Sequence, residues 1–129
     1  MDASALVKRY VAEPGREQVV DAMASAGVWA MARLGYVETL RALLLGAPPR
    51  GAAAFRAEWP AFRSIELTAE LADLAVDLAA SHQLSSADAV HLASALLVHT
   101  VDHVELATFD DRLAEAAEAE GLQVVPGKR

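Results

Sequence analysis

Hydrophobic residues recur at two spacings along this chain, and segments of the two kinds alternate. Apolar residues three and four positions apart lie on one face of a helix, and this spacing predicts helices at residues 5–11, 15–27, 33–45, 49–62, 68–83, 85–97 and 110–120. Short apolar or alternating runs predict strands at residues 28–32, 63–67, 103–108 and 122–125. Because short strands alternate with amphipathic helices, we expect an α/β fold with parallel strands.

Two of the expected helices combine an apolar face with an acidic residue beside it. The helix at 85–97 has Asp88 in its first turn and begins with Ser85 or Ser86, either of which can cap its first N–H groups. Its expected buried face consists of Ala89, Leu92, Ala93, Leu96 and Leu97. In the helix at 33–45, Glu38 lies next to the expected apolar side. That side consists of Leu34, Val37, Leu40, Leu44 and Leu45.

Composition indicates a folded globular protein. The chain has 129 residues, of which 54% are hydrophobic and 22% charged, so we expect one domain, residues 1–129, with its own core. Cysteine is absent, which excludes disulfides and thiolate metal sites and is compatible with a cytoplasmic location. We expect neither a signal peptide nor a membrane span, because no apolar run has the required length and flanks.

The net charge of −7 at pH 7 narrows the range of partners. It argues against broad, non-specific attraction to a nucleic-acid backbone. It favours a basic partner protein. An enzyme that acts on nucleic acid remains compatible with this charge, because bound cations can invert the charge of an acidic active site.

Four acidic residues occur at junctions between the expected elements. Asp2 precedes the first helix, Glu38 interrupts an apolar helix, Asp88 lies in a first helical turn and Asp110 follows the strand at 103–108. Ligands of open α/β sheets bind at the carboxyl ends of the strands, and Asp2, Asp88 and Asp110 fit that location. Carboxylates gathered there repel one another unless a cation neutralises them. Mg²⁺ or Mn²⁺ would suit oxygen ligands and can activate water for displacement at phosphorus.

Four blocks around these acids resemble the signature blocks of PIN domains, most closely those of the VapC type, the ribonuclease toxins of bacterial toxin–antitoxin pairs. They are DASALVK at residues 2–8, VETLRAL at 37–43, ADAVHLA at 87–93 and ATFDDRL at 107–113. No single block is very specific, but the ordered set spans nearly the whole chain and keeps the family's order and spacing. In that family a strand of several apolar residues precedes the first Asp. Only Met1 precedes Asp2 here, so we expect a truncated first strand.

The resemblance implies a small three-layer α/β/α sandwich with a mainly parallel central sheet, commonly found as a homodimer. It implies an endoribonuclease toxin that hydrolyses RNA phosphodiesters with Mg²⁺ or Mn²⁺. The implied catalytic metal site is made by Asp2, Glu38, Asp88 and Asp110. Ser4 and Thr108 match the hydroxyl positions that support these acids. The implied partner is a VapB-like antitoxin whose tail covers the active site.

Several assignments near the four acids have alternatives. Asp111 competes with Asp110; we prefer Asp110, which lies two residues after Thr108, and expect Asp111 to assist. His91 follows Asp88 at metal-ligand spacing, but hard ions prefer oxygen, so we expect it to pack or to form a hydrogen bond. Basic residues near the acids are candidates for RNA contact, namely Arg9, Arg41 and Arg112. For each of them a solvated or salt-bridged role is the simpler interpretation.

Two other functions are compatible with part of this pattern. The first is a catalytically silent PIN-like module that binds or regulates, and the presence of all four acids argues against it. The second is a phosphatase-like α/β enzyme with Asp2 as the nucleophile. That chemistry usually needs a second Asp close behind the nucleophile, and Ser4 occupies the nearest such position.

Overall fold

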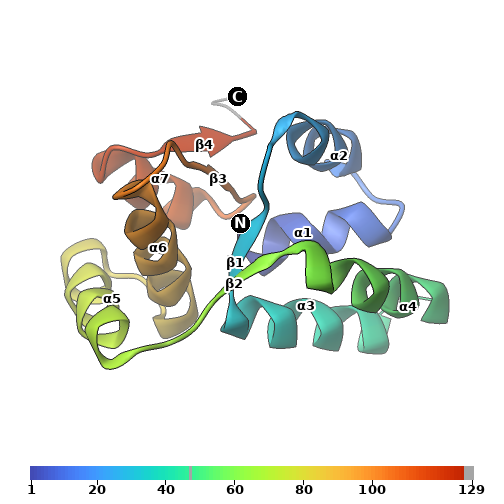
Figure 1. The fold of residues 1–129 in the computed structure, drawn as a ribbon, viewed down its shortest axis with the longest axis horizontal. Helices are drawn as coiled ribbons and strands as arrows, with labels where there is room; N and C mark the ends of the chain where they lie inside the picture. Colours follow the sequence, from blue (N-terminus) through green and yellow to red (C-terminus); the bar gives the residue numbers. More distant parts are fainter. Residues whose placement is uncertain (47, 127–129) are drawn as a thin grey trace.

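The structure is a computed structural model that describes residues 1–46 and 48–126 (Figure 1). The helices are α1 (Ala3–Tyr10), α2 (Arg16–Ser25), α3 (Arg33–Gly46), α4 (Pro49–Glu58), α5 (Ala69–His82), α6 (Ser86–His99) and α7 (Asp111–Ala119), with a short 3₁₀ turn, η1 (Trp59–Ala61). The strands are β1 (Ala30–Ala32), β2 (Arg63–Ile65), β3 (Glu105–Ala107) and β4 (Gln123–Val125). Every predicted helix and strand is present, although the strands are shorter than predicted. Within the described residues, no helix is long and apolar enough to cross a membrane.

The strands form two parallel pairs, β1 with β2 and β3 with β4. Met1 and Asp2 lie between these pairs. The Met1 ammonium donates to the carbonyl of Ala30 in β1, and the Asp2 N–H donates to the carbonyl of Ala107 in β3, each over 3.1 Å. The predicted α/β class with parallel strands is confirmed, and the first two residues connect the two strand pairs.

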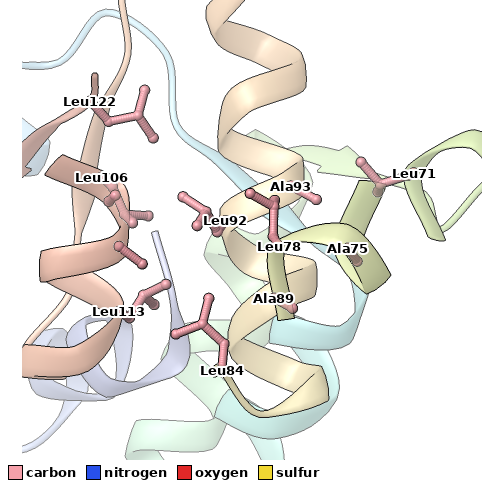
Figure 2. Close-up of a cluster of buried hydrophobic side chains, with 12 residues drawn as sticks. Leu71, Ala75, Leu78, Leu84, Ala89, Leu92, Ala93, Leu106, Leu113 and Leu122 are labelled. Atoms are coloured by element: carbon pink, nitrogen blue, oxygen red, sulfur yellow. The ribbon is translucent and has the colours of Figure 1, made fainter. Parts of the chain in front are cut away.

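Two hydrophobic cores lie on either side of this connection. The first is formed mainly by α5, α6, α7 and β3, and Figure 2 shows Leu92 of α6 facing Leu106 of β3 within it. The second is formed mainly by α1, α2, β1, α3 and α4. Its centre is the fully buried Phe55, whose ring lies 5.4 Å from that of Tyr10 and 5.7 Å from that of Trp59. Figure 1 shows the N-terminus between these two groups of helices.

The orientation of α3 corrects one prediction. Leu40 is buried as predicted, with 9% of its surface exposed. The other four apolar residues form an exposed row instead: Leu34, Val37, Leu44 and Leu45 are 36%, 55%, 56% and 71% exposed. We call these four residues the α3 apolar row. The prediction that they face the core is therefore wrong.

Small residues account for this orientation of α3. Gly35 and Thr39 are buried together with Leu43. A Cβ atom at Gly35 would lie 2.5 Å from the side chain of Met31 in β1, so any larger residue would require the buried Met31 to move. Gly35 therefore permits the close approach of α3 to β1, and Leu40 and Leu43 of the same helix belong to the second core.

Three smaller differences concern the ends of elements. Leu97, predicted to be buried, is 48% exposed, because the buried residues of α6 end at Ser94 and the last turn projects beyond the core. Val28, predicted within a buried strand, is 57% exposed and precedes the start of β1. The helix predicted for 49–62 ends at Glu58, because Pro60 has no N–H to continue it.

Candidate active site

Asp2 is a buried carboxylate with hydrogen bonds to both oxygens. It caps α1, where Oδ1 accepts from the Ala5 N–H over 3.2 Å and from the Ser4 hydroxyl over 2.8 Å. Oδ2 accepts from the Thr108 hydroxyl over 2.8 Å. The residue is 4% exposed, and these bonds offset part of the cost of burying an ionised group. The Asp2 side chain is therefore held in one orientation.

The two predicted supporting residues, Ser4 and Thr108, both contact Asp2 and join the start of α1 to the end of β3. Thr108 Oγ1 also accepts from the Asp110 N–H, and Ser4 Oγ accepts from the Phe109 N–H, each over 3.0 Å. Each hydroxyl thus donates to the carboxylate and accepts from the backbone that follows β3. This small network fixes the geometry of two segments far apart in the sequence.

Asp110 connects the same network to α7. Its Oδ1 caps that helix by accepting from the Leu113 N–H over 2.8 Å, and the helix N-terminus favours a negative charge there. Asp111, the first residue of α7, is exposed. The Asp110 N–H donates to Thr108, so Asp110 is tied directly to the hydroxyl that holds Asp2. This contact supports the preference for Asp110 over Asp111.

Asp88 lies in the first turn of α6, which belongs to the first hydrophobic core, whereas Asp2 caps α1 of the second. Ser85 caps α6 as predicted, because its hydroxyl accepts from the Asp88 N–H over 3.2 Å. Burial raises the pKa of the Asp88 carboxyl, and the charges of Asp110 and Asp2 raise it further, against a smaller opposing effect of Ser85 and His91. Asp88 therefore lies close enough to Asp110 and Asp2 for their charges to act on it.

Glu38 belongs to α3 and is paired with a residue of α6. Its Oε1 accepts a hydrogen bond from His91 Nε2 over 2.6 Å. The His91 side chain is only 2% exposed, whereas that of Glu38 is 33% exposed. The hydrogen bond expected for His91 is thereby confirmed, and it links Glu38 to the helix that carries Asp88.

Arg9, one of the candidates for RNA contact, is occupied by a structural ion pair. Its Nε and Nη2 each donate to a carboxylate oxygen of Glu58 over 2.9 Å. Its guanidinium also lies over the ring of Trp29, 5.1 Å from the centroid. The salt-bridged interpretation is confirmed for Arg9, which stabilises the packing of α1 against α4.

Arg41 and Arg112 have fewer contacts. Arg41 is exposed on α3, three residues after Glu38 and therefore on the same side of that helix. Arg112 is exposed on α7, and its Nη1 donates to the carbonyl of Gln83 at the long distance of 3.5 Å. Both guanidinium groups lie on elements that carry a candidate acid.

The donor set fits a hard divalent cation by its chemistry, since oxygen is the ligand that Mg²⁺ and Mn²⁺ prefer. The repulsion that raises the pKa of Asp88, after burial, is of the kind that a bound cation relieves. Among residues 1–46 and 48–126, however, no group of three or more His, Asp or Glu side chains has the arrangement of a metal site. Oxygens of Asp2, Glu38 and Asp110 are instead hydrogen-bonded to protein groups.

A cavity of about 440 Å³ lies between β1 and β3, and it is separate from these acids. Met1, Trp29 and His91 are among the residues that line it, and none of the four candidate acids does. Burial lowers the pKa of the Met1 amino group there, and the charge of Asp2 opposes this effect. The cavity therefore adjoins the candidate active site through His91, the partner of Glu38, and is not lined by the acids themselves.

The fold and the site define an α/β protein with an acidic site near the carboxyl ends of parallel strands. The chain belongs to the PIN domain family, whose sequence model matches residues 1–119. This finding confirms the family indicated by the four sequence blocks. It covers every residue of the network around Asp2.

Three similar proteins align with almost the whole chain. The chain is 37% identical over 136 residues to Ribonuclease VapC45 and to Ribonuclease VapC49 of Mycobacterium tuberculosis, with 98% of this chain and 94% of each relative aligned. It is 32% identical over 128 residues to Ribonuclease VapC46 of the same species, with 97% and 94% aligned. Its fold is similar to the crystal structure of Mycobacterium tuberculosis VapC20, a Sarcin-Ricin loop cleaving toxin, with a TM-score of 0.73 and 20% identity over 94% of this chain and 93% of that one. This last likeness concerns the fold alone.

Sequence reasoning missed two contributions to the site. The N–H groups of Phe109 and Asp110 orient the supporting hydroxyls, and backbone donors have no sequence signature. Glu38 and His91 were each singled out, but their pairing was not predicted, because 53 residues separate them. Only the packing of α3 against α6 brings them together.

Proposed function

We propose that this chain is a divalent-metal-dependent endoribonuclease of the VapC type, the toxin of a VapBC-like toxin–antitoxin pair. The observation that carries the proposal is the network that joins the Asp2 carboxylate, through the Thr108 hydroxyl, to the backbone of Asp110 within a member of the PIN domain family. The relatives named as ribonucleases, which align with nearly the whole chain, support the same activity. In this proposal the substrate is RNA and the place of action is the cytoplasm.

The proposed ion is Mg²⁺ or Mn²⁺, and it would be held by Asp2, Glu38, Asp88 and Asp110. When bound, such an ion activates water and stabilises the charge that develops at phosphorus. The fit rests on the chemistry of the donors, which are all carboxylates, and on the unrelieved repulsion at Asp88.

The chain's own residues prepare this site before any ion arrives. The hydroxyls of Ser4 and Thr108 keep the Asp2 carboxylate in one orientation. The cap of α7 does the same for Asp110, and Asp111, the next residue, assists from the exposed side of the site. Preorganised ligands reduce the reorganisation that binding would otherwise require.

In this proposal a few local basic side chains contact the RNA, because the chain as a whole carries a net charge of −7. Arg41 and Arg112 are exposed and lie three and two residues after the acids Glu38 and Asp110. Guanidinium groups so placed would contact phosphates on either side of the cleaved bond and position the strand without reading its sequence.

The proposed partners are a VapB-like antitoxin and a second copy of the chain. An acidic site is inhibited by a basic segment, and an antitoxin Arg or Lys would form charge-assisted bonds with Glu38 or Asp110. The exposed α3 apolar row supports a homodimer, because apolar rows of this kind are usually covered in soluble proteins. Light scattering of the wild type and of a Leu44→Lys variant tests the second point: a dimer that becomes a monomer supports it, and a monomeric wild type contradicts it.

The activity is tested with purified chain and a labelled RNA, in Mn²⁺ or Mg²⁺ and in EDTA. We expect cleavage that requires the ion and that falls by orders of magnitude in Asp2→Asn and Asp88→Asn. Asp77→Asn is the matched control, because Asp77 is an exposed acid on α5 outside the site. Cleavage that persists in EDTA, or that survives in folded Asp88→Asn, would contradict the proposed metal mechanism. A folded wild type that binds RNA but never cleaves it would indicate a silent binding module instead.

A further inference from the structure

His91 is a buried polar ring that lines the cavity beside the hydrophobic core of α5, α6 and α7. The residue is 3% exposed, and its neighbours Leu92 and Ala93 are completely buried members of the core of α5, α6 and α7. Burying a polar group costs free energy unless its hydrogen bonds are kept. An apolar side chain of similar shape would suit this position at least as well for folding.

Of the two ring nitrogens of His91, only Nε2 has a hydrogen-bond partner in the part of the chain that the structure describes. Nε2 lies 2.6 Å from Oε1 of Glu38, and an ionised carboxylate can only accept, so the hydrogen is on Nε2. Nδ1 is buried and has no hydrogen-bond partner among the described residues. The stability of the core therefore does not explain this histidine, because only its contact with Glu38 is satisfied.

We propose that His91 is a positioning residue that holds Glu38 in place for the metal site. The inference rests on the proposed function and adds to it a residue that does not itself touch the ion. Glu38 is partly exposed and has a long, flexible side chain, whereas the ring of His91 is fixed by the surrounding core. A donor that cannot move restricts the carboxylate that it contacts.

The position of His91 on α6 strengthens this inference. It follows Asp88 by three residues, so both side chains project from the same side of that helix. Glu38 belongs to α3, so its hydrogen bond to His91 links its carboxylate directly to the helix that carries Asp88. Because only Oε1 is engaged by His91, the bond sets the direction of Oε2 without occupying it.

The test uses His91→Leu, which removes the donor at similar volume, and His91→Gln, which keeps an N–H donor at a similar reach. Mn²⁺ alone is the probe, measured by calorimetry and by melting curves with and without EDTA. We expect the metal-free His91→Leu protein to melt close to the wild-type temperature, because the loss of the bond to the partly exposed Glu38 is offset by the removal of a buried Nδ1 that has no partner in the described part of the chain. Its Kd for Mn²⁺ should rise by about 10–100-fold, as expected when a residue that orients a ligand is lost. His91→Gln should recover most of the affinity.

RNA cleavage gives a second readout. The Mn²⁺ concentration for half-maximal activity should rise in His91→Leu, while KM for RNA at saturating Mn²⁺ stays unchanged. In a Glu38→Gln background the additional effect of His91→Leu on Mn²⁺ affinity should largely disappear, because the two residues act as one unit.

Three outcomes would overturn the inference. One is wild-type Mn²⁺ affinity in His91→Leu, and a second is a His91→Gln protein as impaired as His91→Leu. A third is an affinity loss that merely follows a lowered melting temperature, which would indicate a structural role. In all three the wild type still binds Mn²⁺ and cleaves RNA, so the proposed function stands. A wild type that neither binds Mn²⁺ nor cleaves RNA would remove both proposals together.

Discussion

Thr108→Val is the substitution that most directly tests the network around Asp2. Thr108 is 2% exposed, donates to Asp2 Oδ2 over 2.8 Å and accepts from the Asp110 N–H over 3.0 Å. Valine has nearly the same shape as threonine, so the change leaves no cavity and removes only the hydroxyl. Its effect therefore reports mainly these two hydrogen bonds, together with a long contact of 3.4 Å between the hydroxyls of Thr108 and Ser4.

The expected loss of stability follows from the groups that lose a hydrogen-bond partner in Thr108→Val. A hydrogen bond to a charged group contributes about 1.5–3 kcal/mol, and a fully buried N–H left without its acceptor costs about 1–3 kcal/mol. The second cost is smaller here, because the bond of the Asp110 N–H is only partly buried. Asp2 keeps the Ser4 hydroxyl and the Ala5 N–H, which moderates the first contribution. We therefore expect a decrease of about 2–4 kcal/mol in the free energy of unfolding, or roughly 10 °C in Tm for a chain of this length.

Chemical denaturation followed by far-UV circular dichroism, without added metal, measures this loss. Thr108→Ser is the matched control, because it keeps the hydroxyl and removes a methyl group. The serine protein should lose clearly less stability than the valine protein and should retain more RNA cleavage. A valine protein within about 0.5 kcal/mol of the wild type, the usual range for unimportant surface changes, would refute the reasoning. So would a serine protein that loses as much as the valine protein.

Three further predictions concern charges at helix starts and on the surface. Asp88→Asn should leave the metal-free protein as stable as the wild type or more stable near neutral pH. Because burial and neighbouring acids raise the pKa of Asp88 in the folded state, its ionised form costs stability at neutral pH. That cost should disappear as the pH falls through the raised pKa, so the melting temperatures of the two proteins should converge in acid. An Asp88→Asn protein less stable than the wild type at neutral pH would contradict this prediction. Asp110→Ala should lose about 0.5–2 kcal/mol with the cap of α7, whereas Asp110→Asn should keep most of it, as urea unfolding can measure; equal losses would exclude the capping role. Arg33→Ala should change the free energy of unfolding by less than about 1 kcal/mol, because the side chains of Arg33 and its partner Glu66 are 52% and 58% exposed. A larger loss in urea unfolding would contradict this small contribution of the ion pair.

Much of the secondary structure could be predicted from the sequence because its causes are local. Ser85 caps its helix as predicted by accepting from an N–H three residues ahead, and Thr68 and Asp110 cap theirs in the same way. The alternation of helices and strands followed from apolar spacing, and the family followed from four ordered blocks that the PIN domain match supports. These features depend on residues a few positions apart, whose contacts the helix or strand itself imposes.

The face that each helix buries depended on tertiary packing. The α3 apolar row predicted the wrong side, because the face of α3 that contains Gly35 packs closely on Met31 and leaves this row exposed. Helical spacing shows that apolar residues share a face, but it does not state what the opposite face will meet. Only the packed neighbours decide this, because a close-packed interior rejects a poor fit in shape.

The candidate site likewise has features that the sequence predicts and features that only the tertiary structure decides. The sequence alone predicted its chemical content, which is four carboxylates, two hydroxyls and a nearby histidine. The tertiary structure decided the pairs: Thr108 with Asp2, 106 residues apart, and His91 with Glu38, 53 residues apart. A hydrogen bond requires two atoms to meet within about 3 Å at a suitable angle. For segments so distant in sequence, that meeting is set by how the two cores pack around β1 and β3, and no local pattern records it.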